Sequence, residues 1–360
     1  MAWTTVFMDG FDHYATADIL GKWNNSQSNP IIDSSQFRNS GQALRTGGAN
    51  TIGVSKAIGQ TRNVCLGFGF RAQAITSAST LASQGGGLMG LTTALTMNTN
   101  SGQVGLGWLN DGKLRAVRGH FAASTFNSPT ELGVASTVLS AATWYYIELR
   151  VFIDDTAGQF ELRINGVSEI NLSGIDTQMS TDNFVSSLLL MGGDGSTNRW
   201  YDDLYVRTSS ASTAEAGGFL GDIKVKPFYP NADGTYSQMT PSTGTTHNTL
   251  VDEALAGTTD YVSSSTAGHK DSYGFQDLSE TGSIKAVQLN VYATKDDAGF
   301  RAIDLFTKSG ATEDFDSAQT LSTTGTYKYK VWENDPNTGS SWSQSNLNSA
   351  EFGVRISSGS

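Results

Sequence analysis

The sequence predicts an all-β protein, and three observations lead to that prediction. Apolar and polar residues alternate with a period of two along most of the chain, as on strands with one buried face. Forty glycines against six prolines, with abundant Ser and Thr, indicate many turns between short strands. No run of ten or more residues has the apolar spacing of an amphipathic helix. We therefore expect stacked β-sheets without a helical layer.

The clearest strands lie in the middle of the chain. In WYYIELRVFID, residues 144–154, Trp144 and Glu148 share one face of the predicted strand and apolar residues share the other. A DDTAG turn and the strand QFELRI follow, and then the pair Asn165-Gly166, which is the strongest short hairpin signal. Together these signals predict a three-stranded meander.

Shorter segments predict the remaining strands. CLGFGFRA, GQVGLGW and FVSSLLLMGG read as strands, whereas GGGLMG, residues 85–90, reads as a flexible loop because no β-α-β context surrounds its glycines. After a Ser/Thr/Ala/Gly-rich break, strands are expected in FLGDIKVKPFYP, SIKAVQLNVYATK, GFRAIDLFTKSG, YKYKVWEND and AEFGVRISS. We therefore expect one domain over 1–210, a linker at 211–220 and a smaller β-sandwich over 221–360.

Charge and composition exclude several classes of function. The net charge of −11 and the absence of a basic cluster argue against a nucleic-acid partner. No stretch approaches the apolar length of a membrane helix, and the first residues lack the pattern of a signal peptide. The single cysteine, Cys65, cannot form an intrachain disulfide. We expect a protein made in a cytoplasm, with no membrane partner.

Two adjacent carboxylates, Asp202 and Asp203 in NRWYDDLYVR, raise the question of catalysis. Neighbours on a regular strand point to opposite faces, so the two side chains would not act together on one sugar. No strand carries the three-acid spacing of the laminarinase-type glycosidases. We therefore predict no catalytic residue, no required cofactor and a protein that is not an enzyme.

Two binding sites remain as sequence-based hypotheses. Asp9, Asp202 and Asp203 could supply the oxygen ligands of a structural calcium ion; alternatively, they lie on exposed strand ends and are satisfied by water and backbone N–H groups. Most tryptophans on alternating strands are expected to be core residues. Trp342, in the polar loop NTGSSWSQSN, is the one ring that we expect to be exposed for stacking on a sugar.

Three stretches, FMDGFDHY, the 144–167 meander and RWYDDLYVR, together resemble a concanavalin A-like (laminin-G-type) jelly roll. The resemblance implies that the first and last strands lie side by side, with a structural calcium in some members of the class. It would bring Asp9 close to Asp202 and Asp203, with one of the adjacent pair facing the first strand or the ion and the other facing solvent. The predicted fold is thus a concanavalin A-like jelly roll followed by a smaller β-sandwich.

The chain also resembles virion proteins of tailed bacteriophages, through stretches such as FLGDIKVKPFYPNADGTYSQM and NDPNTGSSWSQSNLNSAEFGVR. This resemblance implies a structural protein of the particle, either a head decoration or fibre protein or a tail-associated one. Its expected partners are other capsid or tail proteins and copies of itself. The alternative is a carbohydrate-binding module of a tail fibre that recognises glycans on the host surface.

Overall fold

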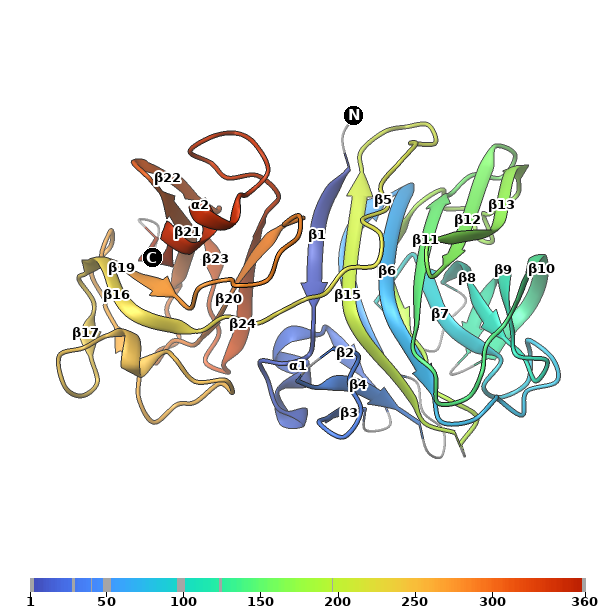
Figure 1. Ribbon diagram of the computed structural model, residues 1–360, viewed down its shortest axis with the longest axis horizontal. Helices are drawn as coiled ribbons and strands as arrows, with labels where there is room; N and C mark the ends of the chain where they lie inside the picture. The colour runs from blue at the N-terminus through green and yellow to red at the C-terminus, as the bar shows by residue number, and fades with distance from the viewer. Residues whose placement is uncertain are drawn as a thin grey trace. The chain divides into compact units, whose positions relative to one another are not determined.

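The computed structural model describes residues 3–27, 30–39, 41–47, 53–95, 101–122, 125–195 and 197–357. The chain forms two compact units (Figure 1). The N-terminal unit comprises Met1–Asp12 and Trp23–Val225, and the C-terminal unit comprises His13–Lys22 and Lys226–Ser360. Both units are built from antiparallel strands, so the predicted all-β class is confirmed.

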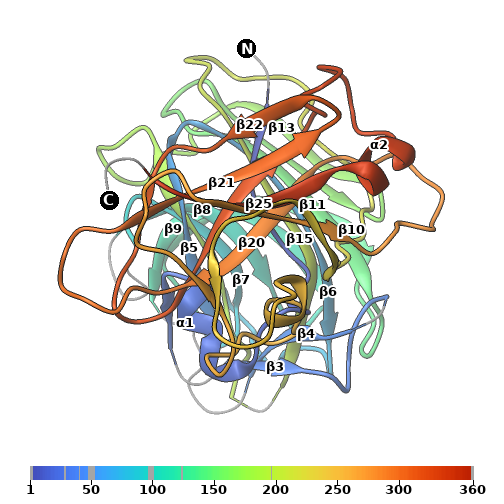
Figure 2. The ribbon, with the colours of Figure 1, turned by 90° about the vertical axis from the view of Figure 1, so that its left-hand side faces the viewer.

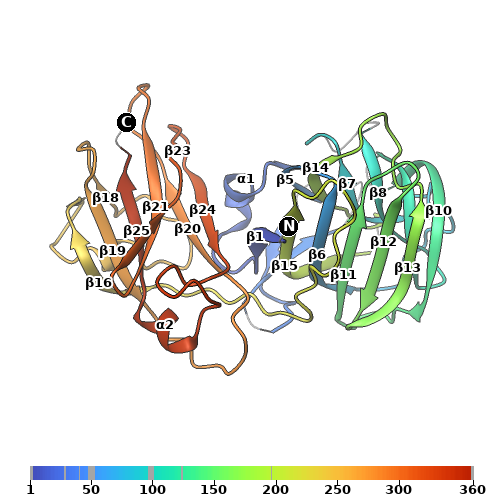
Figure 3. The same cartoon turned by 90° about the horizontal axis from the view of Figure 1, so that it is seen from above.

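The N-terminal unit is a sandwich of two sheets, which Figure 3 shows as separate layers. The first sheet has eight strands. In order across the sheet these are β13 (Val167–Ile175), β12 (Gly158–Ile164), β11 (Tyr145–Phe152), β6 (Asn63–Ala72), β15 (Arg199–Ser209), β4 (Ala43–Thr46) and β3 (Ile31–Asp33), with β1 (Thr4–Asp9) also paired to β15.

The second sheet has seven strands and closes the other side of the core. In order these are β10 (Thr125–Val138), β9 (Lys113–Ala122), β8 (Gly102–Trp108), β7 (Gly87–Thr92), β14 (Val185–Leu190), β5 (Val54–Thr61) and β2 (Asn25–Ser26).

Aromatic side chains fill the space between the two sheets. The ring of Phe70 on β6 lies 5.6 Å from Trp108 on β8 and 5.7 Å from Tyr201 on β15. The Tyr201 hydroxyl donates hydrogen bonds to the carbonyls of Leu88 and Met191 at 3.0 and 2.7 Å. A buried phenol therefore joins the layers and keeps its polar atom satisfied.

Two predictions are confirmed, one made from a local sequence pattern and one implied by the resemblance to concanavalin A-like jelly rolls. Strands β11, β12 and β13 form the expected meander, and Asn165 and Gly166 adopt φ values of 50° and 79°, as a tight two-residue hairpin turn requires. The first and last strands of the sandwich, β1 and β15, pair antiparallel, with Asp9 opposite Leu204.

The glycine-rich segment at residues 85–90 differs from its prediction, because Gly87–Thr92 is strand β7 rather than a flexible loop. A Cβ atom on Gly90 would lie 2.5 Å from the ring of Phe121, and one on Gly107 would lie 2.3 Å from Leu81. The glycines thus leave room for a second apolar cluster on the outer face of this sheet. Its members are Ala78, Leu81, Leu109, Val117, Phe121, Phe126, Leu189 and Met191.

The C-terminal unit contains a six-stranded sheet, whose strands β21 and β25 run side by side in Figure 2. Its core includes Leu305, Trp332, Trp342 and Phe352. The strands are β16 (Pro230–Ser237), β19 (Lys270–Phe275), β25 (Glu351–Ile356), β21 (Ala302–Ser309), β22 (Thr312–Phe315) and β23 (Gln319–Thr320), with the separate pairs β20 (Val287–Ala293) with β24 (Thr326–Trp332) and β17 (Thr240–Pro241) with β18 (Val262–Ser263).

A segment from near the N-terminus completes this second unit. It contains the short helix α1 (Ile19–Lys22) and packs on Tyr327 of β24, whose hydroxyl donates to the carbonyl of His13 at 2.9 Å. The other α-helix of the unit is α2 (Gln344–Ser349), which begins at the N-cap Ser343. Over the described part of the chain, no helix is long and apolar enough to cross a bilayer.

The segment after β15 is tied to the N-terminal unit by hydrogen bonds. The Nε1 atom of Trp3 donates to the carbonyl of Ala216, and the Nδ2 atom of Asn63 donates to those of Ala211 and Thr213, all at 2.9 Å. The strand expected in FLGDIKVKPFYP is wrong, since residues 219–229 are all described and none lies in a strand. Residues 211–225 instead form a strap across the outer face of the first sheet.

Candidate functional site

The sequence-adjacent pair Asp202 and Asp203 lies at a seam in the first sheet. One edge of β15 pairs first with β4, where Tyr201 is opposite Leu44, and then with β1, where Leu204 is opposite Asp9. The pair therefore occupies the interval between two successive partner strands. Asp203 has a φ of 49°, and the register of β15 with β6 shifts between Asp202 and Tyr205, which is a β-bulge.

The bulge turns both carboxylates toward Arg38. Its backbone N–H donates to Oδ2 of Asp202 at 2.8 Å, and its Nη1 donates to Oδ2 of Asp203 at 2.7 Å. Asn39 also donates to Oδ2 of Asp203, and the Val225 N–H donates to Oδ1. The exposures of the two residues are 3% and 2%. The expectation that they point to opposite faces, one of them toward solvent, is therefore wrong.

Two further carboxylates approach this seam. Asp9 accepts hydrogen bonds from the Phe11 N–H and from Nε1 of Trp23, both at 2.9 Å. Asp12 accepts one from the Gln42 N–H at 2.6 Å. Burial, with smaller contributions from the charges of the neighbouring aspartates, raises the pKa of Asp12 to about 7.

The same physical cause acts on the adjacent pair. Burial raises the pKa of Asp202 above its ordinary value, and the negative charge of Asp203 adds to that effect. Burial also raises the pKa of Asp203, although hydrogen bonds from Val225 and Arg38 oppose it. Burial thus raises the pKa of Asp12, Asp202 and Asp203 together, and the seam is a buried acid cluster that faces one guanidinium.

The structure provides no ligand set for the predicted calcium ion. Among the residues that it describes, no three or more His, Cys, Asp or Glu side chains are grouped so as to hold a metal. The oxygens of Asp9, Asp202 and Asp203 accept hydrogen bonds from protein N–H groups, as described above. The Arg38 guanidinium supplies the positive charge that the sequence analysis assigned to the ion.

The predicted sugar platform, Trp342, is buried, so the expectation of an exposed ring is wrong. Its exposure is 4%, its Nε1 atom donates to the carbonyl of Trp332 at 3.2 Å, and its ring lies 6.1 Å from Phe352. The polar loop that carries it folds back through a bridge between Asn334 and Ser341, which turns the indole into the core of the C-terminal unit.

Trp144 is the exception among the seven tryptophans, all of which are described. The other six have exposures of 7% or less, whereas Trp144 is half-buried. It directly precedes β11, in which Tyr145 pairs with Phe70, and Nε of Arg71, the residue after Phe70, donates to the carbonyl of Ala142, two residues before Trp144. The sequence pattern placed Trp144 on the same strand face as Glu148, but we expected it to be a core residue and did not connect it with Arg71, which comes from a distant strand.

Across the sheet, Arg71 pairs with Trp200, and Trp200 pairs with Arg45. Together with Trp144, which precedes β11, these residues of β6, β15 and β4 make up what we call the Trp–Arg row. The Arg71 guanidinium carbon lies 5.0 Å from the ring centre of Trp200, a cation–π contact. Its Nε also donates to the Ala142 carbonyl at 3.3 Å. Two contacts therefore hold this guanidinium in place.

Asp33 anchors the other end of the row. Its Oδ2 accepts from Nε1 of Trp200 at 3.0 Å and lies 3.4 Å from Nη1 of Arg45. Ser35 donates to Oδ1 through both its N–H and its hydroxyl. Burial opposes ionisation of Asp33, but the hydrogen bonds from Ser35 and Trp200 outweigh it and leave the pKa below its ordinary value.

Other segments cover most of the same outer face. Arg38 lies over Gly69 and over the ring of Tyr146, 4.7 Å from its centre. The strap also covers this face. The Arg163 guanidinium carbon lies 4.0 Å from the ring centre of Phe219, and the Gly221 N–H donates to Glu148. No strap residue contacts the Trp–Arg row through a hydrogen bond, ion pair or ring contact in the described part of the chain.

No family model and no curated protein sequence matches the chain. Among solved structures, the alginate lyase Aly36B matches with a TM-score of 0.40 and 12% identity, over 58% of this chain and 98% of that one. Domain 4 of AbnA, an extracellular arabinanase from Geobacillus stearothermophilus in complex with arabinotriose, matches with a TM-score of 0.37 and 13% identity, over 59% and 96%.

A third similar structure is a carbohydrate esterase from the Shiga toxin-encoding bacteriophage phi24B, with a TM-score of 0.36 and 12% identity, over 57% of this chain and 100% of that one. Several of these similar structures thus belong to enzymes. This finding overturns the sequence-based prediction that the protein is not an enzyme.

Proposed function

We propose that the N-terminal unit binds glycans and that the indole of Trp144 is the surface on which a sugar ring stacks. The observation that carries this proposal is the exposure of Trp144, which is half-buried while every other tryptophan of the chain is buried. An indole held at the end of a strand within a sheet offers a large flat apolar surface at low entropic cost, and the apolar face of a sugar ring fits such a surface.

The test is a screen of the whole protein on a glycan array, followed by calorimetry with the best oligosaccharide. Trp144→Ala should weaken binding at least about fivefold, since stacking on an aromatic ring contributes on the order of 1 kcal/mol or more. Trp144→Phe should retain part of the affinity. Tyr261→Ala is the matched control, because this ring is 52% exposed but lies in the C-terminal unit. Full binding by Trp144→Ala would contradict the proposal.

We further propose, on the sequence resemblance alone, that this binding operates on a tailed-phage particle. The protein would then be mounted through other virion proteins and self-association, and a tail position would suit recognition of a host-surface glycan. Antibody-gold labelling of intact particles tests this placement. Label on the tail supports it, label on the head supports a decoration role instead, and unlabelled particles with free protein would exclude both.

A further inference from the structure

We infer that the Trp–Arg row selects sugars that carry a carboxylate, so that the bound glycan is a polymer or oligomer containing uronic acid. This inference rests on the proposed glycan-binding function and names the chemical class of its ligand. It starts from the charges of the row and of its neighbour Asp33. The row contains two guanidiniums, Arg71 and Arg45, and Asp33 adds one carboxylate beside them. Two positive charges and one negative charge leave a net charge of +1, on a chain whose net charge is −11.

Arg71 is the residue placed to meet an anion. Its Nε atom and the face of its guanidinium are engaged by Ala142 and Trp200. Neither Nη atom has a hydrogen-bond or ion-pair partner within the residues that the structure describes. Most of the other arginines pair with a carboxylate, as Arg163 does with Glu161 at 2.8 Å. The half-buried Arg71 therefore presents an uncompensated pair of donors beside Trp144.

The spacing of the row suits one sugar residue. Neighbouring strands lie about 5 Å apart, so a sugar stacked on Trp144 would hold its ring substituents within reach of Arg71 on the next strand. The planar guanidinium fork matches a carboxylate through two parallel hydrogen bonds. Because the cation–π contact with Trp200 already orients this fork, little conformational freedom is lost on binding.

Arg45 is a weaker second contact. Its side chain is 36% exposed and its Nη1 lies 3.4 Å from Asp33, which stays ionised and neutralises part of its charge. A neighbouring acidic residue of the same glycan would use the remaining donors in an ion pair, whereas a neutral sugar offers either guanidinium only hydroxyl oxygens and the weaker hydrogen bonds that they accept. Nucleic acid is the competing ligand chemistry, since bases also stack on indoles. Sites that bind single-stranded nucleic acid neutralise several phosphates, whereas the row together with Asp33 has a net charge of only +1, which favours an acidic sugar.

The experiment uses the full chain and a panel of uronic-acid trisaccharides, each paired with its carboxyl-reduced, neutral counterpart. We expect the acidic member of the preferred pair to bind about tenfold more tightly at low salt, with the difference shrinking as salt is added. Arg71→Gln should remove that difference, and should weaken binding of the neutral member by much less than tenfold, because only the acidic member loses an ion pair. Trp144→Ala should weaken binding of both members. Arg301→Gln, an exposed arginine of the C-terminal unit, is the charge-matched control.

The outcomes separate this inference from the function on which it rests. Trp144-dependent binding of neutral and acidic trisaccharides with equal affinity would overturn the inference and leave the proposed function standing. So would an acidic preference that Arg71→Gln does not change. Absence of glycan binding altogether would overturn both. Tighter, Arg71-dependent binding of an oligothymidine probe would also overturn the inference and identify the row as a single-stranded nucleic-acid site.

Discussion

The Nη1 atom of Arg38 lies 2.7 Å from Oδ2 of Asp203, and this pair holds the seam of the first sheet together. The side chains are 13% and 3% exposed, so both charges are largely removed from water. The left-handed backbone of Asp203 makes the contact geometrically available, and such a backbone is strained for a residue other than glycine. The pair therefore connects an unusual local conformation to the meeting of three strands.

Breaking that pair should destabilise the N-terminal unit strongly. In Arg38→Met the buried carboxylate of Asp203 loses its cation, while the backbone N–H that bonds Asp202 remains. We expect the free energy of unfolding to fall by about 3 kcal/mol or more. Urea denaturation followed by tryptophan fluorescence measures the effect. Arg301→Gln removes an exposed pair with Asp297 and should change stability by no more than about 0.5 kcal/mol. Equal stability of the two variants would show that the seam does not depend on Arg38.

The raised pKa of Asp12 predicts a specific dependence of stability on pH. The pKa is about 7 in the folded protein and near 3.8 in the unfolded chain, so between these values the folded state binds more protons. The free energy of unfolding should therefore fall as pH rises from about 4 to about 7. Asp12→Asn should flatten this decline, with the largest gain over wild type above pH 7 and little difference near pH 4. Denaturant titrations across this range give the two slopes, and parallel slopes would contradict the assignment.

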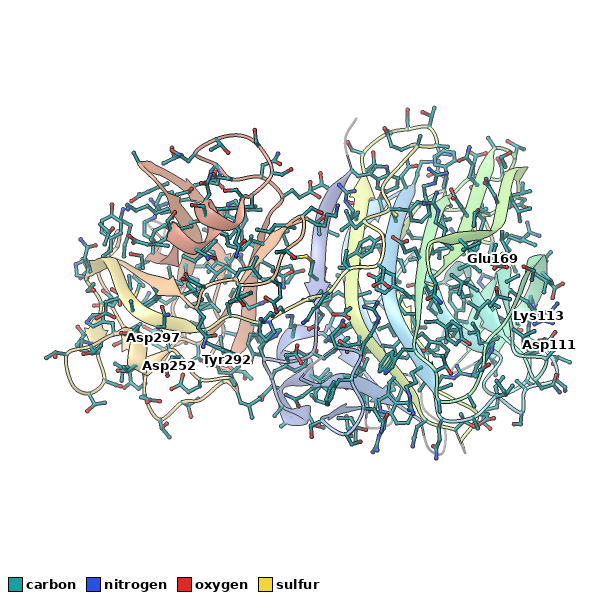
Figure 4. All side chains as sticks on the ribbon, in the orientation of Figure 1. Asp111, Lys113, Glu169, Asp252, Tyr292 and Asp297 are labelled. Atoms are coloured by element: carbon teal, nitrogen blue, oxygen red, sulfur yellow. The ribbon has the colours of Figure 1, made fainter. Side chains whose placement is uncertain are left out.

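Glu169 on β13, labelled in Figure 4, joins the edge strands β13 and β10 of the two sheets by hydrogen bonds. Its carboxylate accepts hydrogen bonds from the N–H groups of Ser136 and Thr137 on β10, with both hydroxyls donating at 2.5 Å. Glu169→Gln keeps the shape but loses the charge, and should cost about 1–2 kcal/mol of unfolding free energy. Hydrogen exchange at Ser136 should accelerate in the variant. Unchanged protection there would mean that β10 is held without this contact.

The close approach of Phe121 to Gly90 predicts that even one added methyl group is not tolerated. Gly90→Ala should lower the free energy of unfolding by about 1–3 kcal/mol, because its Cβ would overlap the ring. Phe121→Leu in the same chain should restore part of the loss, which identifies the ring as the obstacle. Gly257→Ala, with no atom within 4 Å of the added carbon, is the matched control. Denaturant melts of the wild type and the three variants measure these differences.

Trp342 should behave as a core residue and not as a ligand contact. Trp342→Ala removes a buried indole from the C-terminal unit and should cost about 3–5 kcal/mol of stability. Glycan affinity, measured on the folded fraction, should not change. A selective loss of glycan binding without destabilisation would restore the sequence-based assignment of this residue.

The sequence by itself determined the all-β class and the 144–172 meander, while the pairing of the first and last strands was implied only by the resemblance to concanavalin A-like jelly rolls. Alternation and the Asn165-Gly166 turn are local signals, so no distant contact was needed to interpret them. The tertiary structure alone decided the two sites. Asp202 and Asp203 converge because they lie where β15 changes its partner strand, after Tyr201 and before Leu204. That change depends on β4 and β1, which are distant in the sequence. Trp342 is buried and Trp144 is partly exposed because long-range packing decides which loops and straps cover each ring.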